Sequence, residues 1–168
     1  MNRRSAVLVT RFAILGALLL SSFGTRAQGV VTLRVLSLPA AKLIAETALA
    51  ECAARGFHTA VAVVDRYGQL LVLLRDEQAT PATIDMARGK AYTALVFRSS
   101  TLEFQKATAS DPARAAQRDV PGILALGGGV PITVGGEIIG GVASSGSNQT
   151  TDDECARAGL AKAADLLK

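Results

Sequence analysis

Between residues 37 and 75, the pattern of apolar and polar positions predicts a helix followed by a β-hairpin. Ser-Leu-Pro at 37–39 is typical of a helix start, and Gly56 is typical of a helix end. The apolar side chains between them recur at helical spacing, at Ala41, Ile44, Ala48 and Cys52. Two apolar runs follow, at 59–65 and 69–75, and the short link between them contains Gly68, as in many antiparallel hairpins.

A second helix is predicted over Pro81–Ser99, where apolar residues again recur at helical spacing. The stretch from Ser100 to Arg118 is more polar, which predicts a short helix and a surface excursion. Asp111-Pro112 is typical of a turn or a helix start within that excursion.

Glycines dominate the next part of the chain, where eight of the sixteen lie between residues 127 and 146. Gly135-Gly136 is suited to a two-residue hairpin loop between strands at 131–134 and 137–142. The acidic residues 152–154 are expected in the first turn of a last helix, where carboxylates favour the positive helix end. Helices and hairpins in this order predict an α+β fold with an antiparallel sheet.

The first 27 residues have the pattern of a secretory signal. Arg3, Arg4 and Arg11 precede an apolar run of nine residues at 12–20, and Thr25-Arg26-Ala27 has small residues at the two positions that a signal peptidase reads. The run is too short to span a bilayer, which needs about 20 residues. We therefore expect cleavage near Ala27, export to the periplasm or medium, and a single domain over 28–168 that does not span the membrane.

The net charge of +4 follows from this signal. Four of the 18 basic residues and none of the 14 acidic residues lie before residue 28, so the expected mature chain has no net charge. It also lacks a cluster of Lys and Arg with aromatic platforms, which single-stranded nucleic acid needs. We expect no nucleic-acid partner.

Few side chains suggest chemistry. His58, Tyr67 and Tyr92 have atoms that can ligate a metal, although packing or solvation explains each of them as well. Met86 is a further candidate, but a methionine at helical spacing usually fills space in the core. Lys90 on a largely apolar helix could act as a base or an anion clamp, or simply extend to the helix edge.

Two further features have two interpretations each. Successive amides of Gly127-Gly128-Gly129 could bind an anion, or the glycines could serve a tight hairpin. Cys52 and Cys155 are both on predicted helices of an exported chain, so they could form a disulfide that joins the first helix to the last, or remain two buried thiols.

Four stretches together resemble the GlcG/HbpS family of haem-degrading domains. They are AVAVVDRYGQLLVLLR (60–75), MARGKAYTAL (86–95), GGGVPITVGGEIIGGVASSG (127–146) and DDECARAGL (152–160). The resemblance implies a profilin-like or PAS-like α+β fold, with a five-stranded antiparallel sheet flanked by helices. It also implies homo-oligomers such as octamers, and a small-molecule ligand.

The resemblance implies an exported protein that binds haem or a similar planar ligand. Arg75, Lys90, Gly128 and Gly129 would face the carboxylates of the ligand, beside Pro131 of the matching Gly-Gly-x-Pro segment. The metal would be approached by one of several side chains: His58, Tyr67, Tyr92, Met86 or Thr93.

The alternative is a periplasmic accessory enzyme that acts on a small organic acid or an aromatic catabolic intermediate. Lys90 would then be the base or anion anchor, and Asp65 or Glu154 would carry the proton.

Overall fold

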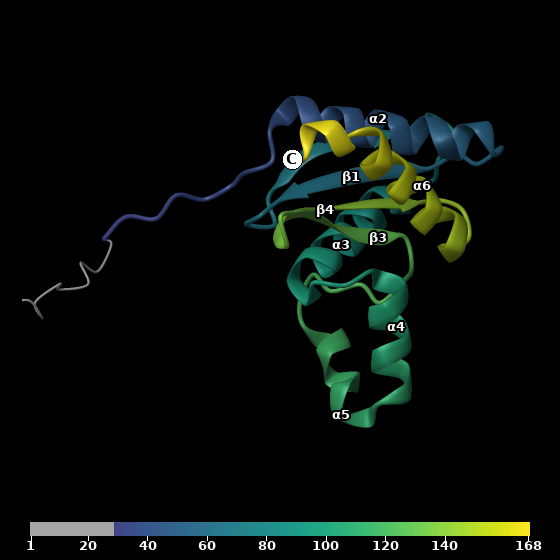
Figure 1. The fold of residues 1–168 in the computed structure, drawn as a ribbon. Coiled ribbons are helices and arrows are strands. Elements are labelled where there is room, and N and C mark those ends of the chain that lie inside the picture. Colours follow the sequence, from purple (N-terminus) through teal and green to yellow (C-terminus); the bar gives the residue numbers. More distant parts are fainter. Residues whose placement is uncertain (1–28) are drawn as a thin grey trace, which may run out of the picture. The chain divides into compact units, whose positions relative to one another are not determined.

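Four antiparallel strands form one sheet in the order β2-β1-β4-β3, in a computed structural model that describes residues 29–168 (Figure 1). The strands are β1 (Ala60–Asp65), β2 (Leu70–Arg75), β3 (Gly129–Val134) and β4 (Glu137–Ser145). Two hairpins, β1–β2 and β3–β4, thus meet through the central pair β1–β4, in which Ala60 lies opposite Ser145 and Asp65 opposite Gly140.

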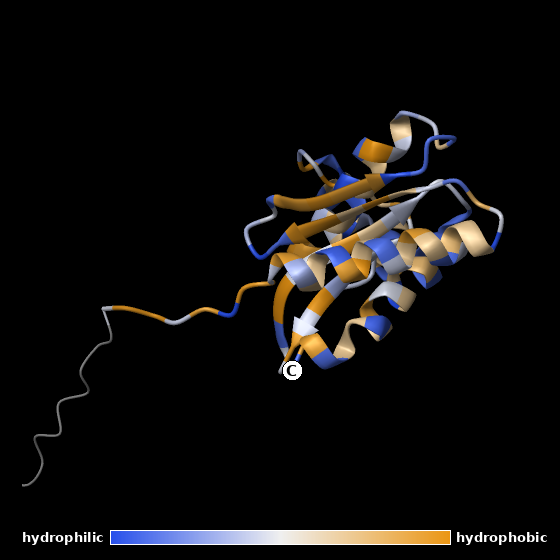
Figure 2. Ribbon diagram, turned by 90° about the horizontal axis from the view of Figure 1, so that it is seen from above, coloured by the Kyte–Doolittle hydropathy of each residue, from blue (hydrophilic) through white to orange (hydrophobic). Residues whose placement is uncertain are grey.

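Helices cover both faces of this sheet. The first and last long helices, α2 (Leu38–Ala54) and α6 (Gln149–Lys162), lie side by side on one face, and α3 (Ala82–Phe97) covers the other (Figure 1). Residues alternate between the faces along β1: Val61 and Val63 belong to the core beneath α2, whereas Ala60, Ala62 and Val64 pack with α3. In Figure 2 most of the sheet is coloured as hydrophobic, whereas the helices alternate between hydrophobic and hydrophilic residues.

The polar stretch after α3 forms α4 (Thr101–Ser110), α5 (Pro112–Ala115) and the 3-10 turn η1 (Ala116–Asp119). The Ser100 hydroxyl accepts from the Glu103 backbone N–H, and the Glu103 carboxylate accepts from the Ser100 N–H, which starts α4 with a capping box. Asp111 caps α5 in the same region, so this excursion has the helix starts that its sequence predicted.

Glycines let α3 lie close to the sheet. A Cβ atom at Gly141 would collide with the carbonyl oxygen of Ala91, and one at Gly129 would collide with that of Lys90. Because any larger residue would push the helix away from β3 and β4, these two glycines serve helix–sheet packing.

The predicted helices over 37–55 and 81–99 and both hairpins are confirmed, and residues 34–168 form one compact unit. The predicted export signal lies outside the described residues. Within residues 29–168, no helix is both long and apolar enough to cross a membrane.

Two expectations need correction. The described residues contain four strands, not five, and Pro131 in β3 has no N–H to donate, which suits that strand to the edge of the sheet. Of the three acidic residues expected in the first turn of the last helix, only Asp152 lies there, because the helix begins at Gln149 with Asn148 as its cap; the Asp152 side chain is buried.

Candidate functional site

His58 and Asp76 form a polar pair at one end of the sheet, where β1 begins and β2 ends. Nδ1 of His58 lies 3.0 Å from Oδ1 of Asp76, and the Asp76 backbone N–H donates to the Thr59 carbonyl 3.0 Å away. The pKa of the Asp76 carboxyl lies below its ordinary value, chiefly because the Gln78 backbone N–H donates to it and next because the His58 ring does. The pair therefore holds an ionised carboxylate against the imidazole.

A cavity of about 300 Å³ opens beside this imidazole. Its lining is small or apolar apart from a few polar groups: Gly56, Phe57, His58, Gln78, Ala79, Thr80, Thr83 and Gly146. Arg75 orders the loop that bounds the cavity, because its guanidinium donates to the Ala79 carbonyl at 2.5 Å. With Nδ1 donating to Asp76, Nε2 of His58 carries the lone pair and is the atom that can bind a ligand.

The two tyrosines lie together at the opposite end of β1. Tyr67 is in the turn after β1, Tyr92 is on α3, and both line a second cavity of about 330 Å³. The metal-ligand candidates of the sequence thus separate into two places, His58 at the start of β1 and the tyrosines beyond its end.

Lys90 lies inside the protein, with 2% of its side chain exposed. Its ammonium donates to Oδ2 of Asp152 at 2.8 Å and to the Ser144 carbonyl at 3.2 Å. Oδ1 of Asp152 accepts from the hydroxyl of Ser147, so both carboxylate oxygens of Asp152 have a hydrogen-bond donor. This geometry does not favour an enzyme in which Lys90 meets a substrate.

Other candidates on α3 and in the glycine run have partners within the protein. The Thr93 hydroxyl donates to the Gly89 carbonyl and accepts from the Leu124 N–H, and Met86 is half-buried on the same helix. The Gly129 N–H donates to Thr101 Oγ1 at 2.8 Å. Gly128 has a φ of +122°, and a Cβ there would lie 2.6 Å from the Ser144 carbonyl oxygen. These glycines serve close packing.

The two carboxylates proposed as proton carriers also have structural contacts. Asp65 accepts from the backbone N–H groups of Tyr67 and Gln69, which closes the β1–β2 turn. Glu154 is exposed and forms an ion pair with Arg55 at the end of α2. The structure therefore does not bring Asp65, Lys90 and Glu154 together in one site.

Cys52 of α2 and Cys155 of α6 form a disulfide, with an S–S distance of 2.11 Å and a Cα–Cα distance of 5.6 Å. Both residues are fully buried. Of the two interpretations of the sequence, the structure contains the bridge that joins the first long helix to the last.

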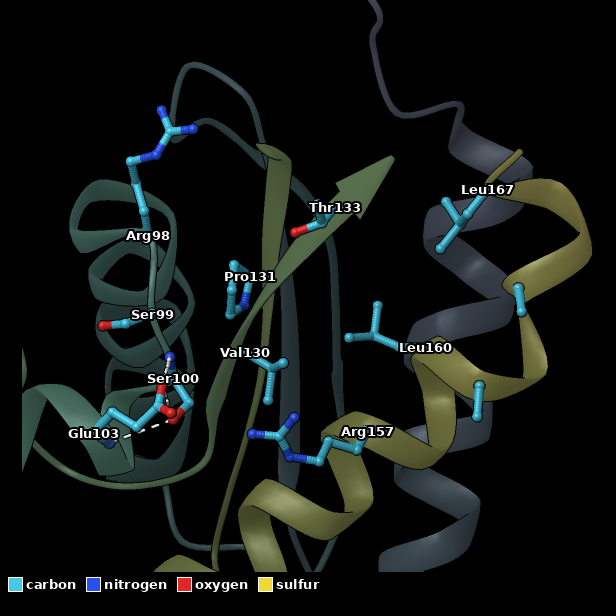
Figure 3. A pocket seen from close by; sticks show the side chains of 12 residues that line it. Arg98, Ser99, Ser100, Glu103, Val130, Pro131, Thr133, Arg157, Leu160 and Leu167 are labelled. Atoms are coloured by element: carbon cyan, nitrogen blue, oxygen red, sulfur yellow. Dashed lines mark hydrogen bonds between the residues drawn. The ribbon is translucent and has the colours of Figure 1, made fainter. Parts of the chain in front are cut away.

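Figure 3 shows a third cavity, of about 590 Å³, beside the edge strand β3. Pro131 is the one predicted ligand residue that lines it, together with Arg157 and Leu160 of α6 and Ser100 before α4. The Arg157 side chain points from α6 toward Val130 and α4, and its Nε donates to Asp153. The sequence offered no signal for this groove, because its walls are far apart along the chain.

Asp76 is the residue that sequence reasoning missed and could have found. Pairing Ala60 with Arg75 in the predicted hairpin places the residues just before 60, which include His58, beside those just after 75, which include Asp76.

Among residues 29–168, no group of three His, Cys, Asp or Glu side chains could hold a metal ion.

These features define an α+β domain with ligand-sized cavities at the ends and edges of an antiparallel sheet. The particular family follows from residues 36–161, which match the family model described as "Haem degrading protein HbpS-like", and the chain belongs to that family. The resemblance to GlcG/HbpS proteins found in the sequence is thereby confirmed.

Individual relatives agree with this assignment. The chain is 32% identical to the protein GlcG of Escherichia coli K12 over 111 residues, which are 66% of this chain and 81% of GlcG. The crystal structure of HbpS superposes with a TM-score of 0.76 at 36% identity, covering 82% of this chain and 96% of HbpS. The crystal structure of a PduOC–haem complex shares the fold, with a TM-score of 0.69 at 22% identity over 77% of this chain and 95% of that one.

Proposed function

We propose that this chain is an exported haem-binding protein in which His58 ligates the iron. The observation that carries the proposal is the His58–Asp76 pair at the mouth of a cavity. Membership in the HbpS-like family and the haem complex of the structurally similar PduOC support it.

The residues at this cavity fit haem. Imidazole is a common axial ligand of haem iron, and metal-binding histidines usually donate their second ring N–H to a carboxylate, as His58 does to Asp76. Gly56 and Gly146 have no side chains that would obstruct a flat ring at the rim, and Phe57 and Ala79 supply apolar surface. Arg75 is next to Asp76 in the chain, and its guanidinium can pair with a haem propionate.

We further propose that copies of the chain assemble and together enclose the ligand. A cavity of about 300 Å³ lies at the lower end of the range for sites that bury most of a ligand, so one copy covers haem only in part. Strand β2 lies at an edge of the sheet, is apolar from Leu70 to Leu74, and exposes 41% of Leu70. Apolar edge strands are surfaces that pair with another chain.

Export is part of the same proposal. The pattern of residues 1–27 supports it, and a buried disulfide is typical of a protein that folds in an oxidising compartment.

Titration of the purified mature protein with haemin tests the iron ligand. We expect the Soret band to shift on binding, and the shift to disappear in His58→Ala. Tyr92→Phe is the matched control, because it removes the other type of candidate ligand and should keep the shift. A Soret shift that survives in His58→Ala and is lost in Tyr92→Phe would overturn the assignment.

Light scattering on the same preparations tests assembly. The wild-type chain should be larger than a monomer, and Leu70→Lys should reduce its mass. Val120→Lys changes an apolar residue that is 49% exposed away from β2 and should leave the mass unchanged. A monomeric wild type would refute the assembly, and an unchanged Leu70→Lys would place the interface elsewhere.

A further inference from the structure

We propose that the cavity lined by Tyr67 and Tyr92 binds a planar aromatic carboxylate. This second site, at the opposite end of β1 from His58, extends beyond the proposed haem function. The cavity measures about 330 Å³ and is lined by the two tyrosines, by aliphatic residues that include Val96 and Ile138, and by Arg66 and Arg98, the last of which also lines the cavity of about 590 Å³ beside β3.

Glycines fix the Tyr92 ring at this cavity. A Cβ atom at Gly68 would lie 2.6 Å from Cε2 of Tyr92, and one at Gly122 would lie 3.4 Å from Cε1. Both glycines have positive φ, in the β1–β2 turn and in the loop after η1. The ring therefore lies closely between two backbone turns, and it also lines a neighbouring cavity of about 490 Å³. A ligand meets an aromatic surface that is already in place.

The two arginines have different roles. Arg66 is held by Glu137, 2.9 Å away, and by the Arg34 carbonyl, so much of its charge is already balanced. Arg98 is exposed at the end of α3 and has no ion-pair partner among residues 34–168. The Arg98 backbone has a φ of +57°, the left-handed conformation in which many helices end, and this residue terminates α3. Arg98 is thus the cation available to a ligand.

The exposed apolar surface indicates the rest of the ligand. Tyr67 is 65% exposed and Val96 is 44% exposed, so a bound ring would remove apolar surface from water at both. Tyrosine rings pack against flat rings, and a guanidinium binds a carboxylate through two hydrogen bonds. The ligand class that uses all of these groups is a carboxylate on one or two fused aromatic rings.

Tyrosine fluorescence gives a direct test, because the chain has no Trp and its two Tyr both line this cavity. The probe is 2-naphthoate, and N-acetyltyrosinamide corrects for light absorbed by the probe. We expect saturable quenching by 2-naphthoate and at least about tenfold weaker binding of 2-naphthamide, which has the rings without the charge. Equal binding of acid and amide, or no saturable quenching, would overturn the proposal.

Arg98→Gln should weaken 2-naphthoate binding by about tenfold, because it removes the cation and keeps a side chain of similar length. Arg114→Gln is the matched control, since it removes an exposed arginine from α5, outside this cavity. Unchanged affinity in Arg98→Gln would refute its role. Tyrosine emission that falls with protein concentration alone would show that a second copy covers the cavity, and this result would also overturn the proposal.

The two proposals can fail separately. Arg98→Gln should bind haemin as the wild type does, and His58→Ala should still bind 2-naphthoate. If Arg98→Gln loses the Soret shift and His58→Ala keeps it, the tyrosine cavity is the haem site and both assignments are overturned.

Discussion

Nζ of Lys90 lies 2.8 Å from Oδ2 of Asp152, and each side chain is only 2% exposed. This ion pair links α3, on one face of the sheet, to α6, on the other, past the end of β4 where Ser144 accepts a further hydrogen bond from Lys90. Two opposite charges that are removed from water together are tolerated only as a pair, because either charge left alone in the interior is strongly destabilising.

Lys90→Met should therefore destabilise the protein by about 3–5 kcal/mol, because it leaves the Asp152 carboxylate buried without its cation. Urea unfolding measures the loss. Lys106→Met, at an exposed lysine of α4, should change the stability by less than about 0.5 kcal/mol. Replacing both partners, in Lys90→Met with Asp152→Leu, should recover much of the loss; a double variant as unstable as the single one would contradict this account.

Removing the disulfide should also destabilise the fold. Cys52→Ala with Cys155→Ala should lower the free energy of unfolding by about 2–5 kcal/mol, since the bridge closes a long loop that would otherwise be free in the unfolded chain. Reductant should destabilise the wild type to the same extent and leave the double variant unaffected. Equal stability of the wild type in oxidising and reducing urea would argue against the bridge.

Asp76→Asn should weaken haem binding by about 10- to 100-fold, because the neutral amide orients and polarises the His58 ring less well than a carboxylate does. The measurement is the haemin titration described above. Glu77→Gln removes the charge of the adjacent exposed carboxylate and should have little effect. Equal losses in the two variants would indicate a general charge effect instead of a specific contact.

Acid should destabilise the protein partly through Asp76. Its pKa is lowered in the folded state, so its contribution to stability is present above its ordinary pKa of about 3.9 and is lost as pH falls below that value toward the folded one. Between pH 5 and 3, roughly, the free energy of unfolding should fall less steeply in Asp76→Asn than in the wild type. Asp119→Asn, which changes an exposed carboxylate of η1, is the control and should keep the wild-type slope.

Local patterns predicted most of the fold. Helix α2 has its Ser37 cap and both hairpins have their glycine turns, because such signals act between residues that are close in the chain. The start of α6 was predicted in part: Asp152 lies in its first turn, but the Asn148 side chain accepts from the Thr151 N–H and starts the helix at Gln149, so Asp153 and Glu154 lie beyond that turn. A fifth strand was implied by resemblance alone.

The candidate site was less predictable because its contacts join distant segments. Helical spacing placed Lys90 on α3, but no local rule pairs it with Asp152, which is 62 residues away. Likewise, the glycine run 127–129 has the composition of an anion site, and only the fold shows that Lys90 and Thr101 already take up the space and the Gly129 hydrogen bond. His58 differs, because the register of one hairpin was enough to bring Asp76 to it.

The Cys52–Cys155 bond has a consequence for how the protein withstands proteases. The two cysteines are 103 positions apart in the sequence, and the chain between them includes all four strands of the described residues and the largely exposed segment from Asp111 to Gly122. A protease that cuts once anywhere within this covalent ring produces two fragments that stay joined as one molecule. A nicked copy can then keep its helices and sheet assembled, and cleavage becomes visible only after reduction.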